Sequence, residues 1–369
     1  MTQLGRPAPY SIRVLDSISA DPSRTTTLMS LIMKNSGIVL VLWAVSGCVT
    51  PESSLAPFTL VVLPDTQEYV DQRTKRAKER LAAGEDRTTF FHDQTSWIRD
   101  SASRLNTKFV VHEGDITQTD DSGEWTRAQS AMSVLDGVVP YCLCLGNHDM
   151  GCSQNAAGGW DSAKTRDSMF DEYFPLAKFA SEPWFGGSHD STLTNAYYFF
   201  SAASMDFLIL SLEFKPRDEV LEWANAVLTK HPDRRSIVLT HAYLRSEKDG
   251  SVRIDGNGYD VAGNHGEMMW RKLVSQHDNL FLVLCGHVLG EGRRVSEGAH
   301  GNSVHEVLCD YQGLENGGNG WLRYMTFHPR ENKIEVFTYS PSLDEFNEQP
   351  SSRFSLEYQM LGVAKEKDE

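Results

Sequence analysis

Residues 143–149 read Leu-Cys-Leu-Gly-Asn-His-Asp, an apolar run followed at once by a glycine and three side chains that can bind a metal or move a proton. Four other apolar runs of the chain lead in the same way to Asp65, Asp115, His241 and His287. In an α/β sheet the carboxyl ends of the strands line the ligand crevice. The five runs therefore predict one site that is assembled from five strand ends.

Between these runs the sequence shows the spacing of amphipathic helices, most clearly at residues 125–135 and 221–228. Alternation of strands and helices favours an α/β architecture. Two further blocks, residues 196–212 and 304–358, are rich in strand patterns. The highly charged residues 71–85 predict an exposed loop or helix beside the site.

The order of the motifs resembles that of the calcineurin-like metallophosphoesterases, over roughly residues 58–340. That family carries Asp-x-His, Gly-Asp-x-x-Asp, Gly-Asn-His-Asp/Glu, a lone His and Gly-His-x-His in this order. The matching segments here are residues 65–67, 114–118 and 146–149, His241, and residues 286–289. The resemblance implies an α/β fold in four layers, in which a two-sheet β-sandwich is flanked by helices on both outer faces. It also implies a single metallophosphoesterase domain over residues 58–369.

The resemblance further implies a centre for two divalent metal ions. The ligands that it implies are, in chain order, Asp65, Gln67, Asp115, Asn147, His241 and His287. Asp115 would bridge both ions. Asn147 and the two histidines would complete one site, whereas Asp65 and the amide oxygen of Gln67 would complete the other.

These residue types suit hydrolysis of phosphate esters, either monoesters or diesters, by a metal-activated water. Two cations ~3.5–4 Å apart hold the attacking and leaving oxygens and lower the pKa of a bound water. Imidazole ligands favour Mn, Fe or Zn at the histidine-containing site. By the same resemblance His148 is the acid beside the leaving oxygen and Asp149 orients it; an imidazole can donate a proton at neutral pH.

Three positions depart from the family pattern. Gln67 and Leu289 stand where two histidine ligands are expected, and Gln118 replaces a carboxylate. The second ion then keeps only oxygen ligands, which predicts weaker binding and a preference for Mn or Mg. One alternative is a degenerate member that binds one metal and a ligand without turnover. Another is an adhesion or carbohydrate-binding lipoprotein that shares only the fold.

Other polar residues near the motifs are interpreted more simply. Glu113 and His112 adjoin Asp115 and predict supporting or packing roles. Side chains that could contact a phosphate or line a substrate groove are Arg293, Arg294, Arg323, Tyr69 and Tyr259.

The composition is that of a globular enzyme, with 369 residues, 40% of them hydrophobic and 23% charged. The net charge of −15 repels phosphate backbones and argues against a nucleic-acid partner, so a small phosphoester is the predicted substrate. Six cysteines are too few for a disulfide scaffold in a chain of this length. We therefore expect buried free thiols at Cys142, Cys144, Cys152, Cys285 and Cys309.

Near the N-terminus, residues 37–45 form an apolar run, Gly-Ile-Val-Leu-Val-Leu-Trp-Ala-Val, that follows Lys34 and precedes Ser-Gly-Cys48. The run is too short to span a bilayer and is typical of a signal peptide. Its end resembles a bacterial lipobox, which implies lipid attachment at Cys48. A buried strand that ends in a free cysteine is the alternative.

The lipobox interpretation makes residues 1–47 a lipoprotein signal region, with Met29 and Met33 as alternative starts, and residues 48–57 a tether. It predicts an exported protein that faces the periplasm or the cell exterior. Contact with the membrane would be through the lipid anchor alone.

Overall fold

The computed structural model describes residues 55–256 and 259–361. The predicted signal region 1–47, the predicted lipidation site Cys48 and most of the predicted tether 48–57 lie outside these residues. Within the described part, no helix has the length and the apolar character needed to cross a bilayer. Export and anchoring therefore stay predictions.

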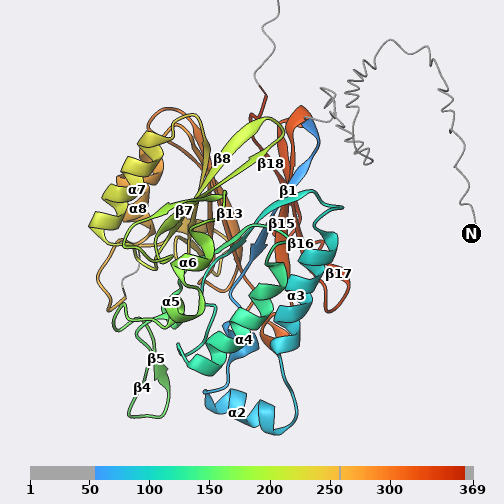
Figure 1. The fold of residues 1–369 in the computed structure, drawn as a ribbon, viewed down its shortest axis with the longest axis vertical. Helices are drawn as coiled ribbons and strands as arrows, with labels where there is room; N and C mark the ends of the chain where they lie inside the picture. Colours follow the sequence, from blue (N-terminus) through green and yellow to red (C-terminus); the bar gives the residue numbers. More distant parts are fainter. Residues whose placement is uncertain (1–54, 257–258, 362–369) are drawn as a thin grey trace, which may run out of the picture. The chain divides into compact units, whose positions relative to one another are not determined.

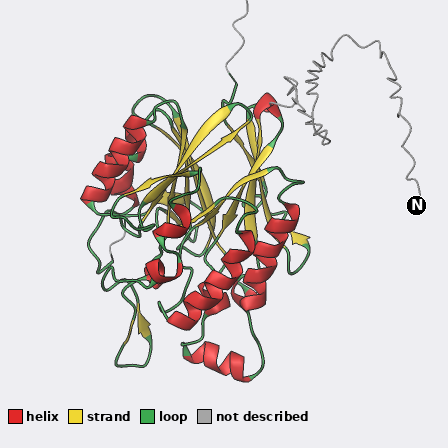
Figure 2. Cartoon of the chain, viewed as in Figure 1, coloured by secondary structure: helices red, strands yellow, loops and turns green. Residues whose placement is uncertain are grey.

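Two seven-stranded β-sheets pack face to face (Figures 1 and 2). The first has the order β17-β16-β15-β1-β2-β3, with β18 paired to β16, and the second has the order β13-β14-β12-β9-β8-β7-β6. The strands of the first sheet are β1 (Phe58–Leu63), β2 (Thr107–His112), β3 (Tyr141–Leu143), β15 (Leu322–His328), β16 (Lys333–Ser340), β17 (Glu345–Phe346) and β18 (Phe354–Glu357). Those of the second are β6 (Phe185–Ser188), β7 (Ala196–Ala202), β8 (Met205–Leu212), β9 (Arg235–Thr240), β12 (Leu280–Cys285), β13 (Gly290–Glu297) and β14 (Ser303–Asp310).

Helices cover both outer faces of this sandwich (Figure 2). Helices α3 (Thr88–Ser101) and α4 (Ser122–Met132) lie on the first sheet, where the Trp97 ring of α3 is 5.7 Å from Tyr324 of β15. Helices α7 (Asp218–Lys230) and α8 (Gly266–Lys272) lie on the second sheet. The predicted four-layer α/β fold is confirmed.

Short elements fill the connections. The remaining α-helices are α1 (Gln67–Val70), α2 (Lys75–Ala82), α5 (Phe170–Tyr173) and α6 (Leu176–Phe179). Two small hairpins consist of β4 (Ser153–Gln154) with β5 (Trp160–Asp161), and of β10 (Leu244–Ser246) with β11 (Val252–Ile254). The 3₁₀ turns are η2 (Ser133–Leu135), η3 (Asn147–Asp149), η4 (Val274–Gln276), η5 (Glu315–Gly317) and η6 (Pro329–Glu331).

Aromatic side chains join the inner faces of the two sheets. The ring of Phe58 on β1 lies 5.5 Å from that of Phe207 on β8, and Phe109 on β2 lies 6.0 Å from Tyr198 on β7. Aromatic pairs of this kind add stability beyond their buried area. They fix the distance between the sheets and hence between the loops at their edges.

The parallel strands of both sheets end at the same edge of the sandwich. In the first sheet β1, β2 and β3 run parallel to one another, and in the second β9, β12 and β14 do so. The predicted site residues follow five of these strands, β1, β2, β3, β9 and β12, whereas β14 ends at Asp310, which the sequence analysis did not assign to the site. The sandwich therefore brings residues from both sheets to one place.

Candidate metal centre

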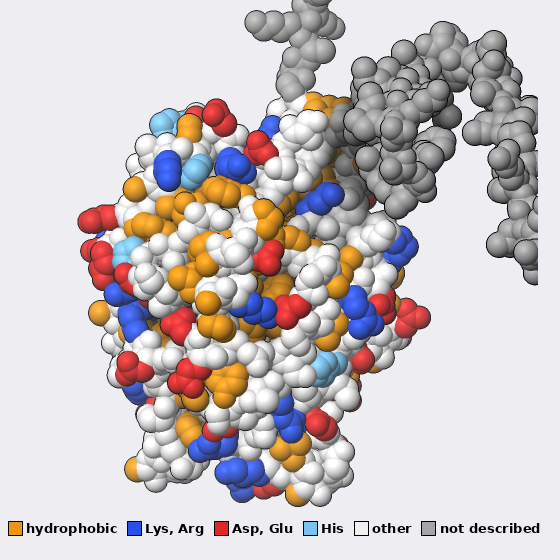
Figure 3. All heavy atoms as spheres, in the orientation of Figure 1, with side chains coloured by type: hydrophobic (Ala, Val, Ile, Leu, Met, Phe, Trp, Pro, Cys, Tyr) orange, Lys and Arg blue, Asp and Glu red, His pale blue; other side chains and the backbone are white. Residues whose placement is uncertain are grey.

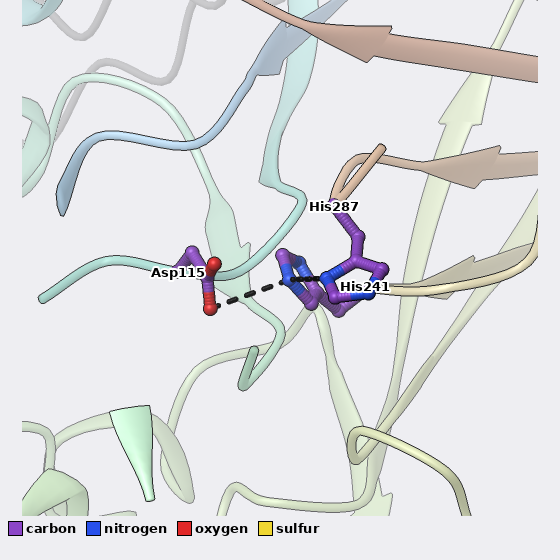
Figure 4. Close-up of side chains that lie close together, drawn as sticks. All are labelled: Asp115, His241 and His287. Carbon is purple, nitrogen blue, oxygen red and sulfur yellow. Dashed lines mark hydrogen bonds and ion pairs between the residues drawn. The ribbon is translucent and has the colours of Figure 1, made fainter. Parts of the chain in front are cut away.

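The imidazole of His241 lies at the centre of the site, just after β9. Its Nδ1–H donates to the carbonyl oxygen of Glu113 at 2.9 Å, so its Nε2 atom carries the lone pair. Three ligand-type atoms surround that Nε2: Asp115 Oδ1 at 3.3 Å, Asn147 Oδ1 at 3.2 Å and His287 Nδ1 at 3.2 Å. Figure 4 shows Asp115, His241 and His287 pointing toward one another.

This arrangement fits a divalent metal ion. The ligand atoms of Asp115, His241 and His287 all lie within 4.8 Å of one another. A carboxylate, an amide oxygen and two imidazoles form a donor set that suits Mn, Fe or Zn. The Glu113 carbonyl accepts the Nδ1–H of His241 and so fixes the tautomer in which Nε2 is free to bind an ion. The structure thus brings together the four residues predicted for the first ion.

Burial and neighbouring charges set the protonation of these groups. Burial favours neutral His241, but the Asp115 carboxylate, the Glu113 carbonyl and Asp149 together outweigh burial and raise the pKa of His241. Burial, together with the nearby His241, lowers the pKa of His287 to about 3. Burial disfavours the Asp115 anion, but His241 and His148 more than compensate and lower the pKa of Asp115. At neutral pH Asp115 is ionised and His287 is neutral, the states that metal ligands require.

The backbone around Asp115 is shaped for close approach. Its Oδ1 accepts the backbone N–H of His148 at 2.8 Å. Position 146 lies against the Asp115 carboxylate and must be a glycine, because a Cβ there would lie 2.2 Å from Asp115 Oδ1. Asp115 and His287 adopt φ angles of 48° and 72°, which residues other than glycine rarely do. Such strain concentrates at functional sites.

His148 follows Asn147, a predicted ligand, in η3, and its side chain is half-buried. The Nδ1–H of its ring donates to the carbonyl of Gln118 at 2.9 Å, and the Gln118 side chain lies 3.2 Å from the same nitrogen. The Nε2 atom of His148 is therefore the one that can meet a substrate.

The prediction that Asp149 orients this ring is wrong. The buried carboxylate of Asp149 accepts backbone N–H groups instead, from Gly146 at 2.8 Å, Ile116 at 3.1 Å and Thr117 at 2.7 Å. These bonds tie the loop after β3 to the loop after β2. Asp149 thus holds the backbone of the site, and Gln118 orients the ring.

Asp65 and Gln67 lie on the other side of Asp115, after β1. Both carboxylate oxygens of Asp65 accept the backbone N–H of His287, each at 3.3 Å. The Gln67 Nε2 donates to Asp115 Oδ2 at 3.0 Å. The two residues predicted for the second ion therefore adjoin the predicted bridging carboxylate.

The sequence profile of the calcineurin-like phosphoesterases matches residues 58–291. The chain belongs to that family. A curated relative, the uncharacterised protein YvnB from Bacillus subtilis strain 168, is 32% identical over 300 residues, which are 79% of this chain. The chain spans about a fifth (20%) of the length of YvnB. The predicted family is confirmed.

Solved structures with a similar fold include purple acid phosphatase PPD1 from yellow lupin (Lupinus luteus) seeds. It is 12% identical, with a TM-score of 0.48, and the match covers 82% of this chain and 54% of that one. GAP50 of Plasmodium is 11% identical, with a TM-score of 0.44 and coverage of 83% and 90%. Similarity this low does not carry an activity from one protein to another.

This member of the calcineurin-like phosphoesterase family departs from the pattern where the sequence indicated. Leu289 is 60% exposed and lies against Gly313, where a Cβ would meet its side chain at 3.0 Å. Leu289 therefore supplies no ligand to the centre. Gln118 adjoins the His148 ring, where a carboxylate was expected from the family pattern.

Two residues that the sequence analysis missed also lie at the site. Asp310 ends β14, and Gln312 follows two residues later. The Gln312 Nε2 donates to Asp65 Oδ2 at 3.1 Å and to Asp310 Oδ2 at 2.9 Å. The signal was weak, because the strand pattern of residues 304–308, Val-His-Glu-Val-Leu, is interrupted by two polar residues before Cys309 and Asp310.

Most of the weaker candidates have structural roles. Arg323 is fully buried and donates to Glu291 at 2.6 Å, and the Tyr69 hydroxyl accepts the backbone N–H of Gly320 at 2.9 Å. Arg293 stacks on Phe354, and Arg294 pairs with Glu306. Tyr259 is the exception, since it is 41% exposed and its ring lies 5.4 Å from that of His287.

Proposed function

We propose that the protein hydrolyses small phosphate esters with a divalent metal ion bound by Asp115, Asn147, His241 and His287. The observation that carries the proposal is the ring of ligand-type atoms within 3.3 Å of His241 Nε2. An imidazole nitrogen surrounded by an anion, an amide oxygen and a second imidazole is the arrangement of a metal centre. Membership of the family supports the same conclusion.

In the proposed hydrolysis, the metal ion and the residues around it would have separate roles. A divalent ion in this position supplies Lewis-acid polarisation of a phosphoryl oxygen and lowers the pKa of a water. Asp115 provides negative charge and, as proposed from the sequence, spans two metal positions. Because Gln118 engages Nδ1 of His148, a proton on Nε2 could pass to the leaving oxygen as the P–O bond breaks. Gln118 holds the ring in that orientation by accepting from Nδ1–H.

The surroundings favour a small substrate. A cavity of 410 Å³ lies against Asp310 and is lined in part by Leu289, Tyr311 and Leu314. The net charge is −15, and on the face drawn in Figure 3 acidic and basic side chains are interspersed rather than gathered into a basic patch. These features suit a small phosphoester with a partly apolar leaving group better than a polyanion.

Chromogenic phosphomonoesters and phosphodiesters test the proposal. We expect hydrolysis by the purified protein that is lost on chelation and restored by Mn²⁺ or Zn²⁺. Asp115→Asn should abolish activity and lower the metal content, whereas Asp136→Asn, which removes a surface carboxylate paired with Lys178, should change neither. Full activity in a protein shown to be free of metal would overturn the proposal.

The degenerate-binder alternative is a second candidate, because Gln67 donates an N–H to Asp115 and the exposed Leu289 has no atom that can bind a metal. It predicts that the purified chain retains one ion and binds inorganic phosphate without hydrolysing either class of ester. Turnover with added metal would exclude it.

We also propose, from the lipobox, that Cys48 is lipidated and anchors the exported protein to a membrane. Mass spectrometry of the protein from its source membrane tests this. The expected N-terminal residue is a lipid-modified Cys48, and an unmodified chain that begins upstream of it would contradict the proposal.

A further inference from the structure

Two glutamine amides lie among three buried carboxylates beside the metal centre. The Gln312 Nε2 bridges Asp65 Oδ2 and Asp310 Oδ2, at 3.1 and 2.9 Å. The Gln67 Nε2 donates to Asp115 Oδ2 at 3.0 Å and to the amide oxygen of Gln312. The carboxylates come from three different strand ends, so folding alone brings them together.

One atom of this cluster has no partner within the described residues. Gln67 is only 1% exposed, yet its Oε1 accepts no hydrogen bond. The oxygen and the nitrogen of a side-chain amide have nearly the same shape, and a half-turn of the amide exchanges them. After that half-turn the Gln67 oxygen would face Asp115 Oδ2. Two oxygen atoms that face each other in this way need a positive charge between them.

The same half-turn in Gln312 directs its oxygen toward Asp65 and Asp310. What those two carboxylates accept from the described residues are N–H groups of neutral partners, namely the Gln312 side chain and backbone and the His287 backbone. Neutral N–H groups do not balance the negative charge of the buried carboxylates. A cation within the cluster would do so and would recruit both amide oxygens.

We propose that Asp310, with the amide oxygens of Gln67 and Gln312, completes the second metal position with Asp65 and Asp115. Leu289 cannot bind a metal, so Asp310 would replace the histidine ligand that the family pattern places at position 289. Asp310 lies on the neighbouring strand, where it pairs directly with Gly290, the residue after Leu289. The resulting set contains only oxygen donors, which suits Mn²⁺ or Mg²⁺ better than Zn²⁺. When the ion binds, the side-chain amides of Gln67 and Gln312 make the half-turn described above, so that their oxygens face the ion.

This inference rests on the metal centre of the proposed function, but its test reads binding rather than turnover. Calorimetric titration with Mn²⁺, combined with metal analysis after dialysis, should show one retained ion and one weaker site in the unmodified protein. Asp310→Asn should leave the retained ion in place and weaken the second site by about 100-fold or more. Glu297→Gln, at an exposed position of the same sheet, is the control and should bind like the unmodified protein.

Electron paramagnetic resonance of the Mn²⁺-loaded protein gives an independent readout. Two Mn²⁺ ions bridged by Asp115 should give an exchange-coupled spectrum, and Asp310→Asn should give the spectrum of isolated Mn²⁺. If Asp310→Asn does not fold, Gln312→Leu removes an amide ligand while leaving all the carboxylates, and should weaken the second site in the same assay.

The outcomes separate this inference from the proposed function. Unchanged affinity of the second site in both Asp310→Asn and Gln312→Leu would overturn the inference, as would the absence of a second site at millimolar Mn²⁺. Two ions bound as described, without hydrolysis of any ester, would instead refute the proposed function and leave the ligand assignment standing.

Discussion

At the scale of single residues, the site shows where backbone strain is tolerated. Asp115 and His287 hold left-handed conformations at φ 48° and 72°, each at a cost of about 1–3 kcal/mol. Both side chains thereby reach the same point beside His241 Nε2. An ordinary extended backbone would carry them away from each other. The strain is therefore part of how the ligand cluster is formed.

His148→Ala should lower turnover by about 10²–10⁴-fold, the range expected for a positioned acid, while the metal content stays nearly unchanged. The reason is that its ring touches Gln118 and not the ligand atoms around His241. Steady-state kinetics and metal analysis of the same samples check this. His300→Ala, at an exposed histidine, is the control. A large loss of metal in His148→Ala would make His148 a ligand instead.

His112 makes stability depend on pH. The buried ring accepts the Gly114 N–H at 3.2 Å on Nδ1 and lies 2.9 Å from Thr66 Oγ1 through Nε2, so it is satisfied only when neutral. Burial, and then the nearby His241, lowers the pKa of His112 to about 3. Below pH ~6.5 the unfolded chain binds a proton that the folded chain does not. The free energy of unfolding should therefore fall as pH drops from about 6.5 toward 3, by up to about 1.4 kcal/mol per pH unit from this group.

His112→Gln keeps one acceptor and one donor but cannot titrate. Urea unfolding at a series of pH values should show a slope smaller by about one proton in the variant than in the unmodified protein. Parallel pH profiles for the two proteins would show that His112 does not carry this dependence.

At the scale of elements, the ends of parallel strands make the site. Two of the loops contain a glycine at which a Cβ would strike a carboxylate of the site: at Gly146 it would lie 2.2 Å from Asp115 Oδ1, and at Gly286 it would lie 2.1 Å from Asp65 Oδ1. The strand ends give the direction of the ligands, and the glycines let neighbouring loops come close enough for those ligands to meet.

Gly146→Ala and Gly286→Ala should therefore affect the two ions differently. Gly146→Ala would displace Asp115, the proposed bridging ligand, and should weaken both proposed sites, whereas Gly286→Ala would displace Asp65 and should weaken the second site alone. We expect decreases of about 10–100-fold in Mn²⁺ affinity, as is typical when the groups that orient a ligand are disturbed. Calorimetric titration measures both, and each variant serves as the control for the other. Equal effects on the two sites would contradict the division of ligands.

The elements also show what a sequence can reveal and what it cannot. Strands β1, β8 and β12 coincide with mainly apolar stretches of the sequence, because central strands are buried on both faces. Strand β13 was missed, since its sequence Gly-Glu-Gly-Arg-Arg-Val-Ser-Glu is that of an edge strand without an apolar run. Helix α3 was missed because polar and β-branched residues break up its apolar stripe.

The same reasoning applies to the ligands. His241 and His287 were predicted because they stand directly after apolar runs. The partner of the His148 ring was misassigned to Asp149, since adjacency in sequence does not reveal that η3 turns that carboxylate toward the backbone. Gln312 was missed because only the pairing of β14 with β12 and β13 brings it to Asp65.

At the scale of the whole molecule, the packed interior protects the thiols. Five free cysteines lie within the described residues, and four of them are buried. Burial raises the pKa of each buried thiol and disfavours the reactive thiolate. Ellman's reagent should therefore modify Cys152 slowly in the folded protein and all five thiols after denaturation. Rapid reaction of a second described thiol in Cys152→Ser would mean that the interior opens more readily than its packing indicates.

The division of the ligands between the two sheets has a consequence for how the protein is made. Asp115 and Asn147 follow strands of the first sheet, and His241 and His287 follow strands of the second, so neither half of the sandwich carries the full set of proposed ligands. During synthesis the histidines emerge long after the acidic ligands. The complete metal site would therefore form only after the two sheets have packed together, so metal binding would follow the last step of folding. An ion at 1,000 times its dissociation constant would then add about 4 kcal/mol to the finished fold.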